Sequence, residues 1–93
     1  MSDDNAAARF TIVNQLGLHA RAATKLVQLA TRHACDVEIE NDGQIANAKS
    51  VMGVLLLCGA KGTVVTVRAK GPGARACVDA IGQLIADRFG EPE

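Results

Sequence analysis

Residues 16–30 read LGLHARAATKLVQLA, and this stretch decides the fold. Its apolar residues recur at the i, i+3, i+4, i+7 spacing of one helix face, which is the side expected to be buried: Ala23, Leu26, Val27 and Ala30. The residues before it, 9–13, read RFTIV and alternate like a strand, with Phe10 and Ile12 facing inward. His19 and Arg21 are therefore expected where a strand leads into the first turn of a helix.

The start of this helix is a favourable place for an anion. The first amide N–H groups of a helix have no partner within it, and the helix dipole adds partial positive charge there. Phosphate groups bind well at such ends. Near neutral pH a histidine is in large part a neutral nucleophile, and the positive charge of Arg21 and of the helix end should disfavour the imidazolium form of His19. The pattern predicts a site that holds a phosphoryl group.

Two motifs in register resemble those of one known family. Residues 17–21, GLHAR, resemble the active-site motif of HPr, the histidine phosphocarrier of the bacterial phosphoenolpyruvate-dependent phosphotransferase system. Residues 48–55, AKSVMGVL, resemble the family's regulatory serine segment. Residues 59–65, GAKGTVV, resemble the turn and strand that follow it. The likeness spans roughly Phe10 to Phe89, and two motifs in register are far more specific than one.

The resemblance implies a chemistry for each residue of the first motif. Nδ1 of His19 would receive the phosphoryl group from enzyme I and pass it to enzyme II A components. Arg21 would stabilise the group, and the backbone around Ala20, Arg21 and Ala22 would bind it. The chain would then be a phosphocarrier rather than an enzyme, and the relay would need neither a metal nor another cofactor.

One residue departs from the family's commonest motif, which has proline directly after the arginine. Ala22 stands there in this chain. Proline at the start of a helix presets φ, whereas alanine is an excellent helix former and adds one more N–H donor. We expect a slightly looser helix start that still binds phosphate. The departure also makes the chain less typical of carriers for sugar transport.

Ser50 stands where the N-cap of a short second helix is expected, over residues 51–57. As a cap, its hydroxyl would accept a backbone N–H. By resemblance, Ser50 is also the regulatory serine that HPr kinase/phosphorylase modifies. The two roles are compatible, because a phosphate suits a helix N-terminus and could repel acidic partner surfaces.

An apolar docking surface for partner proteins is expected around His19. Its proposed members are Leu18, Val51, Met52 and Leu55. The competing interpretation is that some of them face the core, because the pair 52/55 and the pair 54/57 lie on different faces of so short a helix. By resemblance, Met52 and Leu55 are exposed, and Val54 and Leu57 are buried.

Composition excludes several other classes of protein. The formal net charge is zero and aromatic residues make up 2% of the 93 residues, which argues against nucleic-acid binding. Residues 1–5 are acidic and no apolar signal segment follows, and the longest apolar run, 54–58, is too short to span a membrane. A cytoplasmic location is therefore expected. The three widely spaced cysteines are interpreted as small buried hydrophobic residues: Cys35, Cys58 and Cys77.

The remaining elements complete one α/β (α+β) domain over residues 1–93. Strands are expected at 9–13, 35–40, 44–48 and 63–69, and helices from about 20 to 33, from 51 to 57, and from 74 to about 89. Residues 1–8 and 91–93 are expected to be tails. This β-α-β-β-α-β-α order suits a four-stranded antiparallel sheet with three helices on one face, and the resemblance implies the open-faced sandwich of HPr. A ferredoxin-like ligand-binding domain is the alternative, which the third helix fits poorly.

Two alternative functions also remain. The first is a carrier of the nitrogen-related branch, which regulates and does not import sugar. The second is a purely regulatory module that docks on a transcription factor or enzyme through the helix that begins after Ser50. Such a module would need neither His19 nor Arg21, so their presence counts against it. The protein is expected to be a monomer.

Overall fold

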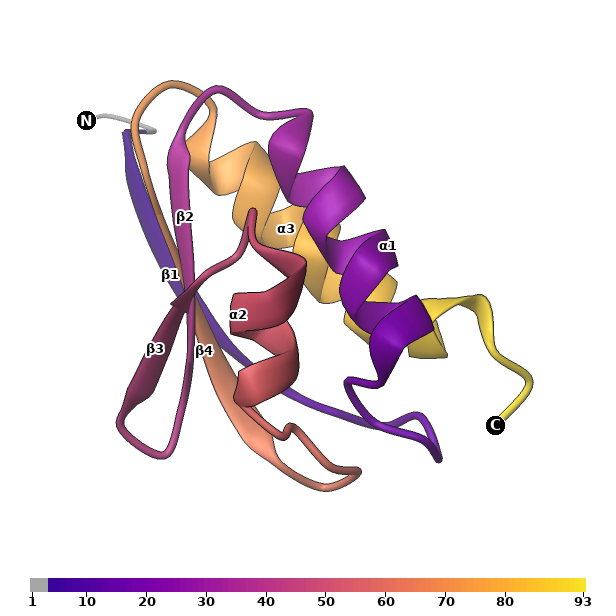
Figure 1. The fold of residues 1–93 in the computed structure, drawn as a ribbon. Coiled ribbons are helices and arrows are strands. Elements are labelled where there is room, and N and C mark those ends of the chain that lie inside the picture. Colours follow the sequence, from indigo (N-terminus) through magenta and orange to yellow (C-terminus); the bar gives the residue numbers. More distant parts are fainter. Residues whose placement is uncertain (1–3) are drawn as a thin grey trace.

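In the computed structural model, which describes residues 4–93, the elements follow the order expected from the sequence (Figure 1). Their bounds are β1 (Asn5–Thr11), α1 (Ala20–Thr31), β2 (Asp36–Asn41), β3 (Gln44–Asn47), α2 (Val51–Leu56), β4 (Val64–Lys70), α3 (Ala74–Ala86) and a short 3-10 helix η1 (Arg88–Gly90). The three α-helices cover one face of the sheet and leave the other open (Figure 1). The predicted open-faced sandwich is confirmed.

The strands form one antiparallel sheet in the order β1-β4-β2-β3. The β2–β3 hairpin turns at Asp42 and Gly43, whose φ angles of 52° and 83° fit the Asp-Gly turn that the sequence predicts. In the central strand β4, Val65 and Val67 lie on the covered face and are fully buried. The alternation of buried and exposed residues along β4 therefore sets which side of the sheet the helices cover.

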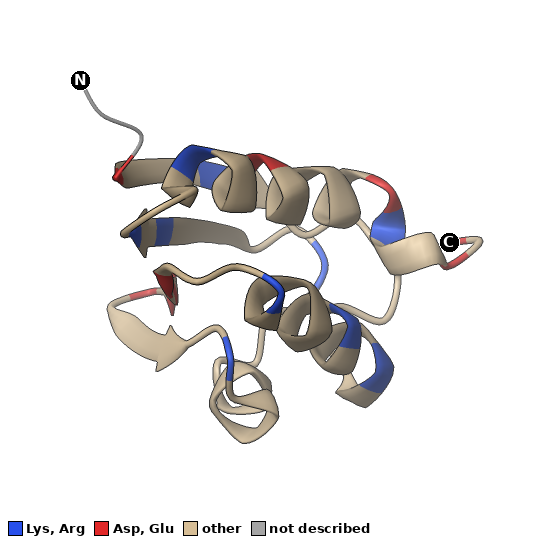
Figure 2. Cartoon of the chain, turned by 90° about the horizontal axis from the view of Figure 1, so that it is seen from above, with Lys and Arg blue, Asp and Glu red and all other residues tan. Residues whose placement is uncertain are grey.

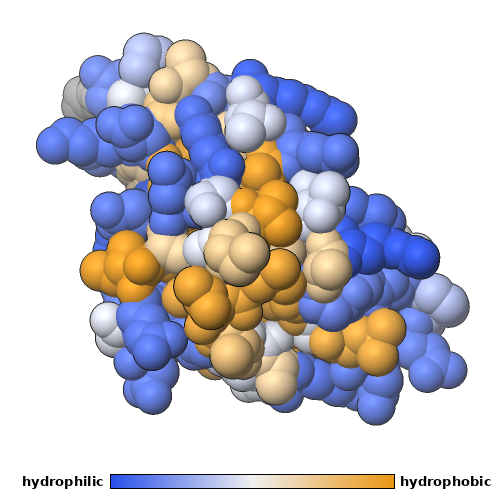
Figure 3. Space-filling model, viewed as in Figure 1, coloured by the Kyte–Doolittle hydropathy of each residue, from blue (hydrophilic) through white to orange (hydrophobic). Residues whose placement is uncertain are grey.

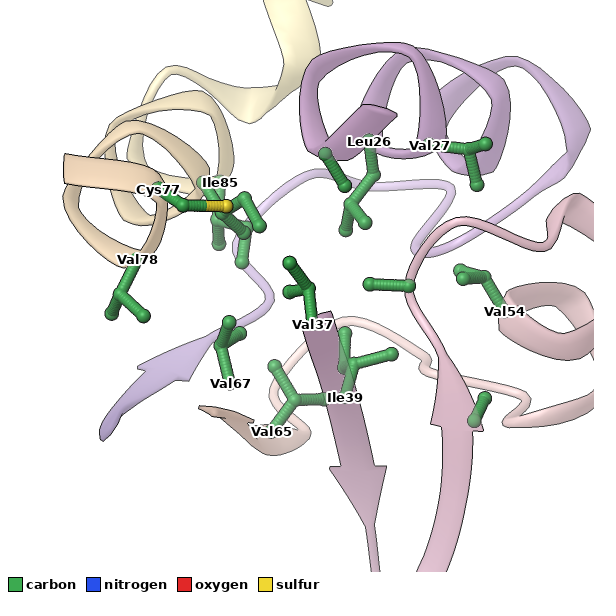
Figure 4. Close-up of a cluster of buried hydrophobic side chains, with 14 of the residues drawn as sticks. Leu26, Val27, Val37, Ile39, Val54, Val65, Val67, Cys77, Val78 and Ile85 are labelled. Atoms are coloured by element: carbon green, nitrogen blue, oxygen red, sulfur yellow. The ribbon is translucent and has the colours of Figure 1, made fainter. Parts of the chain in front are cut away.

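The core lies between the sheet and the helices and is aliphatic, as the composition predicts. Figure 4 shows side chains from the three helices pointing toward those of the sheet: Leu26, Val27, Val54, Cys77, Val78 and Ile85 face Val37, Ile39, Val65 and Val67. Helix α3 approaches β1 closely at Gly82, where an added Cβ would lie 2.3 Å from Cε1 of Phe10. No residue larger than glycine fits there without displacing that ring.

The N-terminal tail predicted over residues 1–8 is wrong for its second half. Asn5 to Ala8 belong to β1 and pair with β4, with Asn5 opposite Lys70 and Ala8 opposite Val67. These residues gave no recognisable strand pattern because alanine stands on both faces of the strand. The inward Ala6 is small enough to be covered at this edge, and it is 9% exposed. Residues 1–3 lie outside the described residues.

Residues 91–93, predicted as a C-terminal tail, lie outside any helix or strand but are held against the start of α1. Helix α3 ends at Ala86, and positive φ angles at Arg88, Phe89 and Gly90 turn the chain back toward the start of α1. Phe89 is fully buried beneath this turn. The backbone N–H of Gln15 then donates to the carbonyl oxygen of Glu93 at 3.0 Å. In Figure 1 this yellow segment runs beside the first turn of α1.

The cysteines follow the prediction at two of three positions. Cys35 and Cys77 are buried free thiols, and burial raises the pKa of Cys77 to about 11, so this group stays protonated near neutral pH. Cys58, predicted to be buried, is exposed. It follows Leu57, the C-cap of α2, and has a φ of 54°, so the chain leaves the helix in a left-handed turn at this residue.

Within residues 4–93, no helix is long and apolar enough to cross a membrane. The same part of the chain contains no cluster of three or more histidine, cysteine, aspartate or glutamate residues that could hold a metal ion.

Candidate functional site

The first turn of α1 begins at His19, which is the N-cap residue with φ −77° and ψ 178°. Its side chain makes no capping hydrogen bond, and the first helical bond runs from the N–H of Ala23 to the carbonyl of His19 at 2.8 Å. Within the described residues, the amide N–H groups of Ala20, Arg21 and Ala22 have no acceptor. The helix therefore presents three free donors beside a histidine.

The loop that leads to His19 is clamped onto the turn before β4. The N–H of Leu18 donates to the carbonyl of Gly59 at 2.8 Å, and the N–H of Gly62 donates to Ile12 at 2.7 Å. Gly17 has a φ of 68°, and a Cβ there would lie 2.5 Å from the carbonyl oxygen of Gly59. Only glycine therefore fits this crossing, which fixes the backbone two residues before the histidine.

A buried asparagine ties this loop to the C-terminal segment. Asn14 is fully buried, and its Nδ2 donates at 2.9 Å both to the carbonyl of Gly17 and to Oε1 of Glu91. Both acceptors require the amide nitrogen on this side, so the orientation of the amide is determined. Its Oδ1 has no partner within residues 4–93.

The imidazole of His19 contacts the carboxylate of Glu91 through Nε2 and Oε2. A carboxylate oxygen can only accept, so the hydrogen of this contact lies on Nε2, and in the neutral ring Nδ1 carries the lone pair. No other described residue bonds to Nδ1. Hydrogen bonds from Asn14 and then from His19 hold the pKa of Glu91 below its usual value.

Arg21 is exposed on the same turn and has no hydrogen bond or ion pair with any described residue. It lines one hollow with His19, Leu16 and Glu91. The structure thus gathers His19, Arg21 and the amides of the first turn at one surface, as the sequence predicts. Both signs of charge are interspersed along the ribbon in Figure 2, and no basic face suited to a nucleic acid is visible there.

The second motif begins the second helix as predicted. Ser50 is the N-cap of α2, with φ −118° and ψ 113°, and its Oγ accepts from the N–H of Gly53 at 3.1 Å. Its side chain is half-buried. The capping interpretation is confirmed, whereas the modification of Ser50 remains a prediction.

The residues predicted to form a docking surface differ in their exposure. Leu18 is buried, because it packs beneath Gly59, so it offers nothing to a partner. Met52 is 66% exposed, Val51 and Leu55 are half-buried, and Val54 and Leu57 are buried as expected. Figure 3 shows hydrophobic side chains gathered on the face that α2 occupies.

Two strongly exposed leucines were not predicted for this surface. Leu56 follows Met52 by four residues, so it shares its face on the helix, and it is 68% exposed. Leu16, in the loop before His19, is also 68% exposed.

Sequence reasoning also missed Asn14 and Glu91. A single polar residue in a loop carries no signal of burial, and a glutamate 72 residues beyond His19 cannot be connected to it by local spacing. The available hint was Phe89, which the sequence placed on the apolar stripe of a last helix running to about residue 89. That helix end was wrong, because α3 stops at Ala86, and Phe89 lies in η1, where it is buried and anchors the segment that carries Glu91.

Known proteins resemble this chain over nearly its whole length. A family model described as the PTS HPr component phosphorylation site matches residues 6–87. Phosphocarrier protein HPr of Cupriavidus necator is 47% identical over 83 residues, which cover 89% of this chain and 93% of that protein. Phosphocarrier protein NPr of Shewanella violacea is 44% identical over 81 residues, which cover 87% of this chain and 89% of that protein.

Among solved structures, HPr-C-His from Thermoanaerobacter tengcongensis matches with a TM-score of 0.91 and 35% identity, over 95% of this chain and 99% of that one. Sequence, fold and the histidine at the open helix end agree. The chain belongs to the HPr family of phosphocarrier proteins of the phosphotransferase system.

Proposed function

We propose that His19 accepts a phosphoryl group from enzyme I and passes it to enzyme II A components. One observation carries this proposal: Nε2 of His19 is occupied by Glu91, while among residues 4–93 nothing bonds to its Nδ1 or to the three amides beside the ring. A nucleophile and the donors for its cargo therefore share one helix end.

The transfer conserves atoms and electrons without a metal on this chain. The lone pair of Nδ1 attacks phosphorus and forms the N–P bond, while the bond to the donor breaks and its electron pair stays with the donor. The ring becomes cationic and keeps its Nε2 hydrogen. Delivery to the acceptor reverses these steps.

The negative phosphoryl oxygens would be held by the first turn of α1. The amides of Ala20, Arg21 and Ala22 supply donors, and the exposed guanidinium of Arg21 supplies a full positive charge. With alanine in place of the family's usual proline, position 22 contributes an N–H that proline would lack. The departure from the common motif therefore adds a donor and removes none.

The experiment is phosphorylation of the purified protein by enzyme I and phosphoenolpyruvate. Wild type should take an acid-labile, alkali-stable label, and His19→Ala should take none. His33→Ala is the matched control, because it removes the chain's other histidine outside the site, and it should be labelled like wild type. Label that persists in His19→Ala, or no label on wild type when enzyme I charges a known carrier, would contradict the proposal.

Regulation through Ser50 is the second part of the proposal. The half-buried hydroxyl already accepts the N–H of Gly53, and a phosphate there would stay near the helix amides rather than unfold α2. Incubation with HPr kinase/phosphorylase and a phosphate donor should label wild type and not Ser50→Ala. The phosphorylated protein should then accept the histidine phosphate more slowly.

The alternative with the same chemistry is a carrier of the nitrogen-related branch. The 44% identity to an NPr protein supports this alternative. Both branches would meet this carrier as a monomer in the cytoplasm. Competition between enzyme I proteins of the two branches for the same purified chain separates them, because the true donor should give the larger kcat/KM. A docking module without transfer would take no phosphate from either and would bind through α2.

A further inference from the structure

We propose that Glu91 is a positioning residue for His19. Its carboxylate, carried by the C-terminal segment, holds Nε2 of the ring so that Nδ1 receives the phosphoryl group. This inference rests on the proposed function and assigns a role to a residue outside both motifs. The contact joins residues 72 positions apart and is made by one side-chain pair, Nε2 of His19 and Oε2 of Glu91.

The segment that carries Glu91 is anchored on both sides. Before it, Phe89 is fully buried, and its carbonyl accepts from Nζ of Lys25 at 2.7 Å. After it, the carbonyl of Glu93 accepts from the N–H of Gln15 at 3.0 Å. Both donors, Lys25 and Gln15, lie within six residues of His19. The segments on either side of His19 therefore hold the Glu91 carboxylate against the ring.

The carboxylate is also shared between two donors. Its Oε1 accepts from Nδ2 of the buried Asn14 at 2.9 Å, and its Oε2 meets the imidazole. Each oxygen is thus aimed by a separate partner, and the plane of the carboxylate is fixed. A glutamine has a single oxygen, so at this position one of the two donors would face an NH2 group instead.

Two consequences for transfer follow from this geometry. The Nε2 hydrogen is retained, so the lone pair for attack stays on Nδ1. When Nδ1 forms its bond to phosphorus, the positive charge that develops on the ring faces a carboxylate at Nε2, which stabilises the transition state. Glu91 exchanges no proton in this account and does not touch the phosphoryl group.

The test compares wild type, Glu91→Gln and the matched control Glu93→Gln. The control removes the same charge two residues further along the chain, and the side chain of Glu93 makes no hydrogen bond to any described residue. The first measurement uses the isolated protein at neutral pH. The ring N–H of His19 should give a proton resonance protected from solvent exchange in wild type and Glu93→Gln. In Glu91→Gln the single oxygen should stay with Nδ2 of Asn14, because Asn14 is fully buried and His19 is partly exposed, so this resonance should be lost. The amide spectrum reports that each variant is folded.

The second measurement is the rate of phosphorylation by enzyme I. Glu91→Gln should lower kcat by about tenfold, the loss expected when one charge-assisted hydrogen bond to a developing cation is removed, with KM changed less than about twofold. Equal ring N–H protection in wild type and Glu91→Gln, or an unchanged kcat, would overturn the inference. No transfer to any of the three proteins would overturn the proposed function, while the resonance would still decide whether Glu91 holds the ring.

Discussion

The N-termini of α1 and α2 are closed in different ways. At α2 the hydroxyl of Ser50 accepts the N–H of Gly53, as an ordinary N-cap does. At α1 the N-cap residue is His19, whose side chain turns away from the helix amides toward Glu91. The N-terminus of α2 is therefore capped by a side chain, whereas the first amides of α1 have no acceptor among the described residues. The comparison teaches that α1 lacks the stabilising side-chain cap that α2 has, and that this leaves the first amides of α1 available to an outside acceptor.

Closing the open end should cause the largest functional loss. Asn at position 19 is a good N-cap and cannot accept a phosphoryl group, so His19→Asn should take no label from enzyme I. Its free energy of unfolding should rise by roughly 0.5 kcal/mol, because the new cap outweighs the lost contact with Glu91. Urea denaturation checks the second effect. If His19→Asn were unlabelled but clearly less stable than wild type, the absence of a side-chain cap at α1 would not be lowering the stability of the wild-type protein.

Breaking the loop that carries His19 should cause the largest loss of stability. In Gly17→Ala the new Cβ would lie 2.5 Å from the carbonyl oxygen of Gly59 on a backbone with φ 68°. We expect a loss of about 2–3 kcal/mol in the free energy of unfolding. Gly43→Ala is the control, because its φ is 83° but nothing lies within 4 Å of the added Cβ, so it should cost about 1 kcal/mol. Equal losses in the two variants would refute the steric explanation.

Opening the closed end should have a smaller effect. Ser50→Ala removes the acceptor for the N–H of Gly53 and should lower the free energy of unfolding by about 1 kcal/mol. Ser50→Asp keeps a capping oxygen and should restore most of that loss. Urea denaturation of the three proteins provides the measurement. If Ser50→Asp were as unstable as Ser50→Ala, the hydroxyl would not be acting as a cap.

The pH dependence of the free energy of unfolding reports the contribution of Glu91, the partner of His19. Hydrogen bonds from Asn14 and His19 lower the pKa of Glu91 from 4.5, so the folded state favours the carboxylate. The stabilisation is therefore fully present above about pH 4.5 and is lost as the pH falls through the lower, folded pKa. Urea midpoints of wild type and Glu91→Gln should differ near neutral pH and converge in acid. A gap that stays constant across this range would show that the charge of Glu91 is not responsible.

The sequence predicted the closed end more completely than the open one. The N-cap at Ser50 depends on residues next to it in the chain, so a local pattern is enough to find it. The same holds for the histidine at the start of α1 and for the Asp42-Gly43 turn. These features were correctly predicted because neighbouring residues determine them. Spacing alone left open which face of α2 is buried, and the resemblance to the family indicated Val54 and Leu57.

What the sequence did not show depends on residues far apart in the chain. Glu91 reaches His19 only because Phe89 is buried and three consecutive positive φ angles turn the chain back. Leu18 looked available to a partner, but the tight crossing of Gly17 over Gly59 buries it. Asn5 to Ala8 form a strand only because β4 is there to pair with them. Tertiary contacts, not local propensity, decide each of these positions.

The most direct test of the comparison is an amide NMR spectrum before and after phosphorylation by enzyme I. If the open end of α1 binds the phosphoryl group on His19, the amide resonances of Ala20, Arg21 and Ala22 should shift strongly downfield. The amide of Gly53, already bonded to Ser50, should stay in place. A phosphorylated protein whose Ala20–Ala22 amides do not move, or whose largest shifts lie at α2, would contradict the account.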